Sequence, residues 1–156
     1  MDLLDRKILN LLQEDSRRSY ASIGREVGVS VTAVKDRIDR LVKKGILKNF
    51  TINIDAVKVG YGVLAFIFVG FEKSEDCQTF ETNVLNSEEV LECHHITGAF
   101  NYLLKVTASS MEDLEQLISA RIKVPGLSCR TETTIVFSSP KKDPFLDCIK
   151  VAAGND

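Results

Sequence analysis

The stretch Ser19–Gly45 constrains the fold of this chain more than any other part of the sequence. It predicts one helix over Tyr20–Val27 and a second over about Val31–Lys44. Gly28 follows the first helix, where glycine is favoured because it adopts a positive φ without steric cost. Ser30 stands where an N-cap belongs, since its hydroxyl can accept a hydrogen bond from the first turn of the second helix. The pattern therefore predicts two helices joined by a tight corner.

The second of these helices has an apolar side and a polar side. Its apolar residues recur at the spacing of one buried stripe, and they are Val31, Val34, Ile38, Leu41 and Val42. The remaining positions are mostly polar. A helix-turn-helix of this kind can place its second helix in a DNA major groove, and the residues expected to contact DNA are Tyr20, Ser30, Thr32, Lys35, Asp36, Arg37, Arg40 and Lys43. The alternative is an ordinary three-helix core with a solvated face.

Charge is unevenly distributed along the chain, although the whole sequence has a formal net charge of only −2 at pH 7. Residues 1–50 contain 11 Lys and Arg against 7 Asp and Glu, a net charge of +4. Residues 51–156 contain 9 against 15, a net charge of −6. A basic first third on an acidic remainder is expected where one part of a protein meets phosphate and the other part meets a different partner.

The segments around the corner complete an N-terminal domain, which we expect over residues 1–54. Asp2–Gln13 predicts an opening helix, with leucine and isoleucine at helical spacing. After Gly45, the segment Ile46–Ile54 has largely alternating apolar residues and predicts a strand or hairpin. A winged helix carries its wing at this position, so we expect a winged helix-turn-helix. Residues 55–62 include two nearby glycines and are expected to form a linker.

The second half predicts a ferredoxin-like βαββαβ domain over residues 63–139, which makes the fold class α+β. Val63–Phe71 is nearly all apolar, as expected of a strand buried on both faces. A helix, two strands, a helix and a last strand follow, expected over Glu75–Leu85, Val90–Ile96, Asn101–Ala108, Ser109–Ile122 and Arg130–Phe137, with a break at Val124–Gly126. A domain of this size can cover only one face of its sheet with helices, so a second copy of the sheet is the natural partner. Residues 140–156 are expected to form a fraying tail.

Composition and spacing argue against membrane, metal and cofactor functions. No apolar run is long enough to span a bilayer, and the N-terminal residues lack the features of a signal peptide, so we expect a cytoplasmic protein. The four cysteines form no C-x-x-C pair. Cys93, His94 and His95 are adjacent, but neighbouring residues of a strand point to opposite faces and do not converge on one ion. We therefore expect no metal site, no cofactor and no catalytic residue.

Taken together, the two halves resemble the Lrp/AsnC family of leucine-responsive, or feast/famine, regulators over nearly the whole chain. Each motif that carries the resemblance is weak alone, but the order and spacing of the motifs are similar to those of the family. They are Asp2-x-x-Asp5-Arg6-Lys7-Ile8-Leu9, Val27-Gly28-Val29-Ser30, Val34-x-x-Arg37-Ile38-x-x-Leu41-x-x-x-Gly45-Ile46, Cys93-x-x-x-Thr97-Gly98-x-x-x-Tyr102-Leu103-Leu104 and Pro125-Gly126-Leu127.

The resemblance implies a transcriptional regulator that binds double-stranded DNA as a homodimer. Dimers of the family pair through the ferredoxin-like sheet, often assemble further into octamers, and bind amino acids between dimers. The positions implied for an effector are Thr97, Gly98, Ala99, Phe100, Asn101, Tyr102, Thr131 and Thr133. The two threonines are equally well explained as ordinary strand residues.

The expected effector hairpin departs from the family at two positions. Ala99 and Asn101 stand where family members often carry carboxylates, and a carboxylate holds an ammonium group more strongly than an amide does. The resemblance therefore implies a neutral or weakly bound effector here, or none, rather than a cationic one.

An enzyme is the alternative to a regulator. A related group of two-domain proteins decarboxylates a modified haem, a tetrapyrrole, and such a site would need basic and histidine residues in the cleft of the second domain. His94 and His95 are the only histidines of the sequence, and residues 51–156 are net acidic. The sequence therefore favours a DNA-binding regulator that is not an enzyme.

Overall fold

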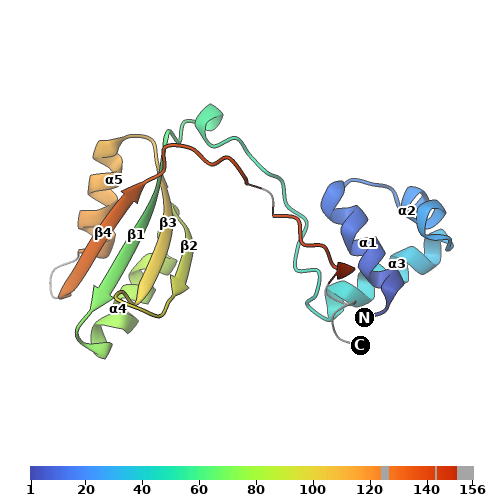
Figure 1. The fold of residues 1–156 in the computed structure, drawn as a ribbon, viewed down its shortest axis with the longest axis horizontal. Coiled ribbons are helices and arrows are strands. Elements are labelled where there is room, and N and C mark those ends of the chain that lie inside the picture. Colours follow the sequence, from blue (N-terminus) through green and yellow to red (C-terminus); the bar gives the residue numbers. More distant parts are fainter. Residues whose placement is uncertain (124–126, 143, 151–156) are drawn as a thin grey trace. The chain divides into compact units, whose positions relative to one another are not determined.

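The structure of the chain is a computed structural model, which describes residues 1–123, 127–142 and 144–150. It contains two compact units (Figure 1). The first comprises Met1–Asn53 with the segment from Lys141 onward, and the second comprises Ile54–Pro140. The segment that the sequence predicts as a separate tail is therefore grouped with the N-terminal helices. Residues 124–126, the predicted helix break, and residues 151–156 of the predicted tail lie outside the described residues.

Three helices form the first unit: α1 (Leu3–Glu14), α2 (Tyr20–Val27) and α3 (Val31–Lys43). A side chain caps the start of each helix and satisfies backbone N–H groups that have no partner in the first turn; the caps are Asp2, Ser19 and Ser30. All three helices contribute to one apolar core, made of Ile8, Leu11, Leu12, Ile23, Val34 and Ile38. The predicted helix-turn-helix is confirmed. Among the described residues, no helix is both long and apolar enough to cross a membrane.

The buried stripe predicted for α3 is wrong at two of its five positions. Val34, Ile38 and Leu41 are buried, whereas Val31 and Val42 are 50% and 47% exposed. Helical spacing places Val31 and Val42 on one margin of the stripe. The two helices that pack on α3 cover the centre of the stripe and leave this margin in solvent.

Close backbone approach sets the corner between α2 and α3. Gly28 ends α2 with a φ of +76°, a conformation that favours glycine. Gly24 lies under the corner, where an added Cβ would come within 2.6 Å of the carbonyl oxygen of Val29. Any other residue at position 24 would therefore push the two helices apart. The sequence pattern indicates Gly28 but gives no sign of the requirement at Gly24.

The strand or hairpin predicted over Ile46–Ile54 is wrong. The structure assigns these residues neither helix nor strand, and Ile52 and Ile54 are 76% and 57% exposed. Alternating apolar residues form a strand only where another strand supplies hydrogen-bonding partners, and no strand of the described chain pairs with this segment. The described part of the first unit is thus a helix-turn-helix without a wing.

The second unit has the predicted order of strands and helices. After the short 3₁₀ helix η1 (Val57–Val59), its elements are β1 (Val63–Phe71), α4 (Ser74–Leu85), β2 (Val90–His95), β3 (Tyr102–Ala108), α5 (Met111–Leu117), η2 (Ile118–Ile122) and β4 (Cys129–Ile135). The strands form one antiparallel sheet in the order β2-β3-β1-β4 (Figure 1). This order confirms the ferredoxin-like arrangement and the α+β class.

Helices cover only one face of this sheet. The core beneath them joins residues of α4 and α5 to alternate residues of β1 and β3, and it includes Phe80, Val84, Leu114, Leu117, Ala65, Ile67, Val69, Leu104 and Val106. The opposite face, called the open face below, carries Leu64, Phe66 and Phe68 of β1, which are half-buried. The burial predicted for both faces of β1 is therefore found at Ala65, Ile67 and Val69 of the helix-covered face, whereas the large side chains of the open face are only half-buried in a single chain.

Candidate functional site

The exposed side of α3 and the corner before it present most of the residues predicted to contact DNA. Those exposed are Tyr20, Ser30, Thr32, Lys35, Asp36, Arg40 and Lys43. The Ser30 hydroxyl has a structural role as well, because it accepts a hydrogen bond from the Ala33 N–H at 3.1 Å and so caps α3. Arg37 and Arg40 are placed differently, since their guanidinium groups bond to α1.

The carboxylate of Asp5 in α1 holds both arginines. Asp5 is only 3% exposed. Its Oδ1 accepts hydrogen bonds from Nη1 of Arg37 at 2.7 Å and from Nη2 of Arg40 at 3.0 Å. The same Nη1 of Arg37 donates to Oδ2 of Asp2 at 2.6 Å, and Asp2 and Asp5 also form the capping box of α1. These ion pairs fix α3 to α1 and neutralise part of the arginine charge before any DNA arrives.

Folding lowers the pKa of both carboxyl groups below the ordinary value of 3.8. For Asp2, the hydrogen bond from Arg37 is the largest cause, followed by the bond from the Asp5 backbone N–H. For Asp5, burial by itself would raise the pKa, but the hydrogen bonds from Arg37, from the Asp2 backbone and from Arg40 outweigh burial. The fold thus stabilises both ionised carboxylates.

The hairpin between β2 and β3, the predicted effector region, lays its Phe100 side chain on the open face of the sheet. The Phe100 ring centroid is 5.5 Å from that of Phe68, and a Cβ added to Gly70 would lie 3.4 Å from the Phe100 ring. The Arg130 guanidinium of β4 covers this ring at 4.5 Å from its centroid. Nη2 of Arg130 also donates to the Ala99 carbonyl oxygen at 2.6 Å.

The tip of the hairpin is exposed, whereas its base is tied to β1. Thr97, Gly98 and Ala99 form the exposed tip, and Gly98 has a φ of +121° that favours glycine. Asn101 follows Phe100, and its Oδ1 accepts a hydrogen bond from the Phe71 N–H at 2.7 Å. Asn101 thus contributes to the shape of the hairpin through the same atom that could have accepted a bond from a ligand.

Tyr102, Thr131 and Thr133 lie on the helix-covered side of the sheet, away from Phe100. Tyr102 is buried, and its hydroxyl donates to Oε1 of Glu81 in α4 at 2.6 Å. Burial, and then the Glu81 carboxylate, raise the pKa of Tyr102. The two threonines pair in register with buried residues of β1, and directly paired residues share a face. The eight predicted effector positions are therefore divided between the two faces, and their contact with an effector stays a prediction.

Arg130 lies at the hairpin although its position in the sequence predicts only the start of a strand. It pairs with Gly70 of β1, so it shares the open face with Phe68. The sequence indicates the strand, but it does not show which alternate residues of the strand face the hairpin. The one indication in the sequence is that Arg130, a charged residue, directly precedes Thr131, a predicted effector position.

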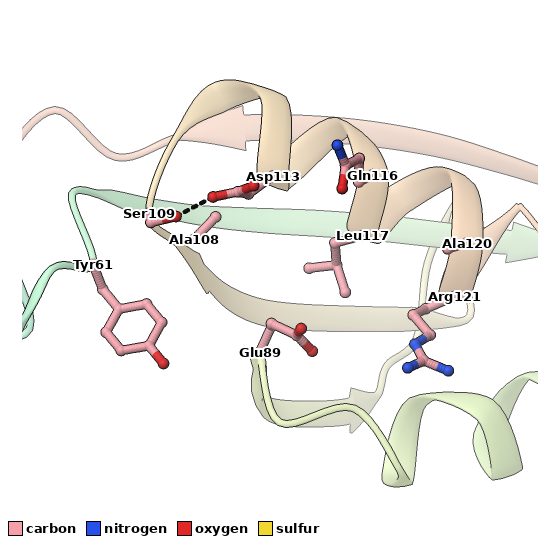
Figure 2. Close-up of a pocket in the computed structure, with 9 residues that line it drawn as sticks. All are labelled: Tyr61, Glu89, Ala108, Ser109, Asp113, Gln116, Leu117, Ala120 and Arg121. Carbon is pink, nitrogen blue, oxygen red and sulfur yellow. Dashed lines mark hydrogen bonds between the residues drawn. The ribbon is translucent and has the colours of Figure 1, made fainter.

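A separate cavity of about 350 Å³ lies at the other end of β3 from the hairpin. It is lined by Tyr61, Glu89, Ala108, Ser109, Asp113, Gln116, Leu117, Ala120 and Arg121. Figure 2 shows Tyr61 and Arg121 at opposite ends of this lining, with Leu117 and Glu89 between them. The Ser109 hydroxyl donates to the Asp113 carboxylate. None of the residues predicted for an effector lines this cavity.

The Cys93-His94-His95 run directs its side chains to different partners. Cys93 packs on the helix-covered core, and burial raises the pKa of its thiol. His94 lies 3.1 Å from Glu92, measured from Nε2 to Oε2, and His95 stacks on Tyr102 at 5.0 Å between ring centroids. Within the ranges that the structure describes, no three His, Cys, Asp or Glu side chains are grouped to hold a metal ion.

Two protein families match the chain, one over each half. Residues 1–42 match the AsnC-type helix-turn-helix domain, and residues 64–146 match the Lrp/AsnC ligand binding domain. The first range contains the corner between α2 and α3, and the second contains the four-stranded sheet except its first residue, Val63. The resemblance drawn from the sequence motifs is confirmed.

Relatives match along nearly the full length of the chain. An uncharacterised HTH-type transcriptional regulator of Pyrococcus horikoshii is 37% identical over 142 residues, which are 90% of this chain and 89% of that protein. The leucine-responsive regulatory protein of Escherichia coli K12 is 30% identical over 145 residues, 91% of this chain and 88% of that protein. The solved structure of E. coli AsnC is similar with a TM-score of 0.86 at 27% identity, covering 93% of this chain and 97% of that chain.

The contacts of Asp5 predict that the first unit is stabilised in a pH-dependent way. A carboxyl group whose pKa is lowered by folding stabilises the folded state above its unfolded pKa, and this contribution is lost as the pH falls through the folded pKa. We expect Asp5→Asn to reduce the free energy of unfolding at neutral pH by about 1–3 kcal/mol. The variant should then lose less further stability than the wild type as the pH falls below 3.8.

Urea unfolding followed by far-ultraviolet circular dichroism, at neutral pH and at about pH 3, measures both effects. Asp36→Asn is the matched control, since it removes an exposed carboxylate from α3. Equal acid sensitivity of Asp5→Asn and the wild type would show that the Asp5 contacts do not stabilise the unit.

Proposed function

We propose, because the chain belongs to the Lrp/AsnC family of transcriptional regulators, that α3 is the recognition helix through which this regulator binds specific DNA sequences. The observation that carries the proposal is the capped glycine corner, which holds the buried side of α3 against α1 and α2 and leaves the polar side in solvent. A helix presented in this way fits the major groove, which is about 12 Å wide.

Different polar residues of α3 would contact base edges and phosphates. Thr32, Lys35 and Asp36 lie in its first turns, the part of a recognition helix that contacts base edges. Lys43 lies at the far end and would contact phosphate. Arg40 keeps about half of its side chain exposed, at 47%, so N–H groups that do not bond Asp5 can also reach phosphate. Arg37 acts as a positioning residue through Asp2 and Asp5.

A second copy of the chain would cover the open face of the sheet. Leu64, Phe66 and Phe68 present apolar surface there, and a sheet face of this kind is normally covered by another layer. A two-fold axis brings the same patch of each copy together. The resulting dimer would place two α3 helices in successive major grooves, about 34–36 Å apart. As in the family, dimers would assemble into larger rings such as octamers.

A small effector would bind at the hairpin, as the match to a ligand binding domain supports. The Arg130 guanidinium has N–H groups beyond the one that bonds Ala99, and these can hold a carboxylate. Glu132, the next residue of β4 on the open face, can accept a hydrogen bond from an ammonium group. The Phe100 ring offers apolar surface between them. Neutral amino acids therefore fit this site better than lysine or arginine, whose second positive charge has no partner at Ala99 or Asn101.

Neither the matching domains nor the relatives described above favour the alternative function, a tetrapyrrole decarboxylase. The matching domains and the relatives carry the names of transcriptional regulators. His94 and His95 contact Glu92 and Tyr102 rather than line a common cleft. The proposed activity is regulation without catalysis and without a cofactor. The cytoplasm is the proposed location, since the partner is DNA.

Removing one lysine from α3 tests the DNA-binding face. We expect Lys35→Ala and Lys43→Ala each to weaken binding to a selected duplex, because each removes a positive charge that displaces counterions from phosphate. The slope of log affinity against log salt concentration should become shallower by about 0.9 for each phosphate that the variant no longer neutralises. Fluorescence anisotropy over a salt series measures this slope. Lys7→Ala removes the same charge from an exposed site on α1, and an equal effect of that variant would show that α3 is not the binding face.

A charge on the open face tests the dimer. Phe66→Asp would bury an unpaired carboxylate against the second copy, at a cost on the order of several kcal/mol. We expect this variant to sediment as a monomer at micromolar concentration, where the wild type sediments as a dimer or larger. Gln78→Asp is the control, since it adds the same charge to the exposed side of α4. A monomeric wild type, or a dimeric Phe66→Asp, would contradict the assignment of the open face.

Replacing Arg130 tests the effector site. Calorimetric titration of the wild type with each of the twenty amino acids should show stronger binding of neutral members than of lysine or arginine. Arg130→Gln should weaken the strongest of these at least about tenfold, because the variant cannot form the charge-assisted bonds to the ligand carboxylate. Lys58→Gln removes a positive charge from an exposed residue of η1, and this control variant should bind normally. Tight lysine binding by the wild type would contradict the proposed charge of the site.

A further inference from the structure

The C-terminal segment docks on one polar face of α1. Arg6, Asn10 and Gln13 are spaced four and three residues apart, so they lie on one side of the helix. All three side chains bond to Leu146–Cys148. These residues belong to the same compact unit as the helix-turn-helix.

Gln13 binds the backbone of Leu146 in both directions. Its Nε2 donates to the Leu146 carbonyl oxygen at 2.9 Å, and its Oε1 accepts from the Leu146 N–H at 2.8 Å. A carboxamide carries a donor and an acceptor side by side, so it can satisfy both backbone groups of one extended residue. Gln13 therefore does for this segment what a neighbouring strand does in a sheet.

Asn10 and Arg6 continue the contact along the helix. Asn10 accepts from the Cys148 N–H at 3.0 Å through its Oδ1 and donates through Nδ2 to Oδ1 of Asp147 at 3.2 Å. Arg6 donates to the Cys148 carbonyl oxygen at 2.6 Å. Asp147 Oδ1 also accepts from the backbone N–H of Ile149 at 3.0 Å, which turns the chain after the contact. Most of these bonds are made to backbone groups. The polar face of α1 therefore recognises the backbone conformation of the segment more than its side chains.

This contact gives the helix-turn-helix a second attachment to the sheet domain. One attachment is the chain that leads from α3 to β1, over residues 44–62. The other begins at the end of β4, at Ile135, and reaches α1 through the docked segment. We propose that Leu146–Cys148 and the Arg6–Asn10–Gln13 face form a tether that restricts the movement of the DNA-binding unit and thereby sets the distance between the two recognition helices of a dimer.

The inference rests on the proposed DNA-binding function and makes a separate prediction. A tether that fixes the spacing raises the effective concentration of the second recognition helix at its half-site, without touching DNA itself. Loss of the tether should therefore weaken binding to a duplex with two half-sites and leave binding to one half-site unchanged. A tail with no such role would change neither affinity.

The test compares full-length wild type with the double variant Asn10→Ala/Gln13→Ala. The probes are a duplex that the wild type selects from a random library and a copy of it with one half-site scrambled. We expect about tenfold weaker binding of the double variant to the intact duplex, and equal binding to the scrambled one. Hydrogen exchange should show slow exchange of the Leu146 and Cys148 amides in the wild type and fast exchange in the variant.

Lys7→Ala is the matched control, since it alters an exposed position of α1 outside the docking face. In this variant the Leu146 and Cys148 amides should still exchange slowly, and the ratio between the two duplex affinities should equal that of the wild type. Unprotected Leu146 and Cys148 amides in the wild type would overturn the proposal, as would an unchanged affinity ratio in the double variant. A wild type that selects no duplex from the library would contradict the DNA-binding function instead, and hydrogen exchange would still decide whether the tether forms.

Discussion

The buried carboxylate of Asp5 is the interaction on which the geometry of the DNA-binding unit depends. Among the described residues it is the one charged side chain that is buried, and it is satisfied from three directions: by Arg37, by Arg40 and by the backbone at Asp2. A buried charge is tolerated only when it is paired in this way. Because both arginines come from α3, the requirement to satisfy Asp5 also fixes how α3 sits on α1.

The ion pairs of Asp2 and Asp5 lower the positive charge that the surface of α3 presents to DNA. The net charge of +4 over residues 1–50 already includes the negative charges of Asp2 and Asp5, and the ion pairs place these two charges beside Arg37 and Arg40 of α3. Asp36 and Asp39 lie exposed on α3 as well. The positive charge that α3 itself offers to phosphate is therefore small. In the proposed dimer two such units would act together, and linked sites gain affinity by effective concentration rather than by further contacts. The roles proposed for the open face and for the tether would both serve this joint binding.

Local spacing was enough to predict the helices, the corner and the order of the sheet, because these depend on caps, glycine and periodicity. Local spacing does not show which other helix or strand packs on a given face of an element. Val31 and Val42 follow the apolar stripe but face solvent, and Ile46–Ile54 alternates like a strand but has no strand to pair with in the described chain. Arg130 and Thr131 differ by one position, and only the register with Gly70 places the arginine on the open face. The docking of Leu146 on Gln13 joins residues 133 positions apart, for which no local pattern exists.

The edge strand β4 carries Arg130 of the proposed effector site and precedes the docked segment along the chain, so it would be the element that couples the two proposed sites. Arg130 lies near its start and holds the hairpin, while its end leads into the segment docked on α1. In the described sheet β4 pairs on one side only, with β1, so fewer hydrogen bonds restrain it than a central strand. An effector changes the DNA-binding state only if it binds one arrangement more strongly than another. Contacts to Arg130 and Glu132 would meet that condition through β4, because a shift of this strand would move the start of the chain that leads to the docked segment, whereas contacts confined to the exposed tip at Thr97 and Gly98 would not.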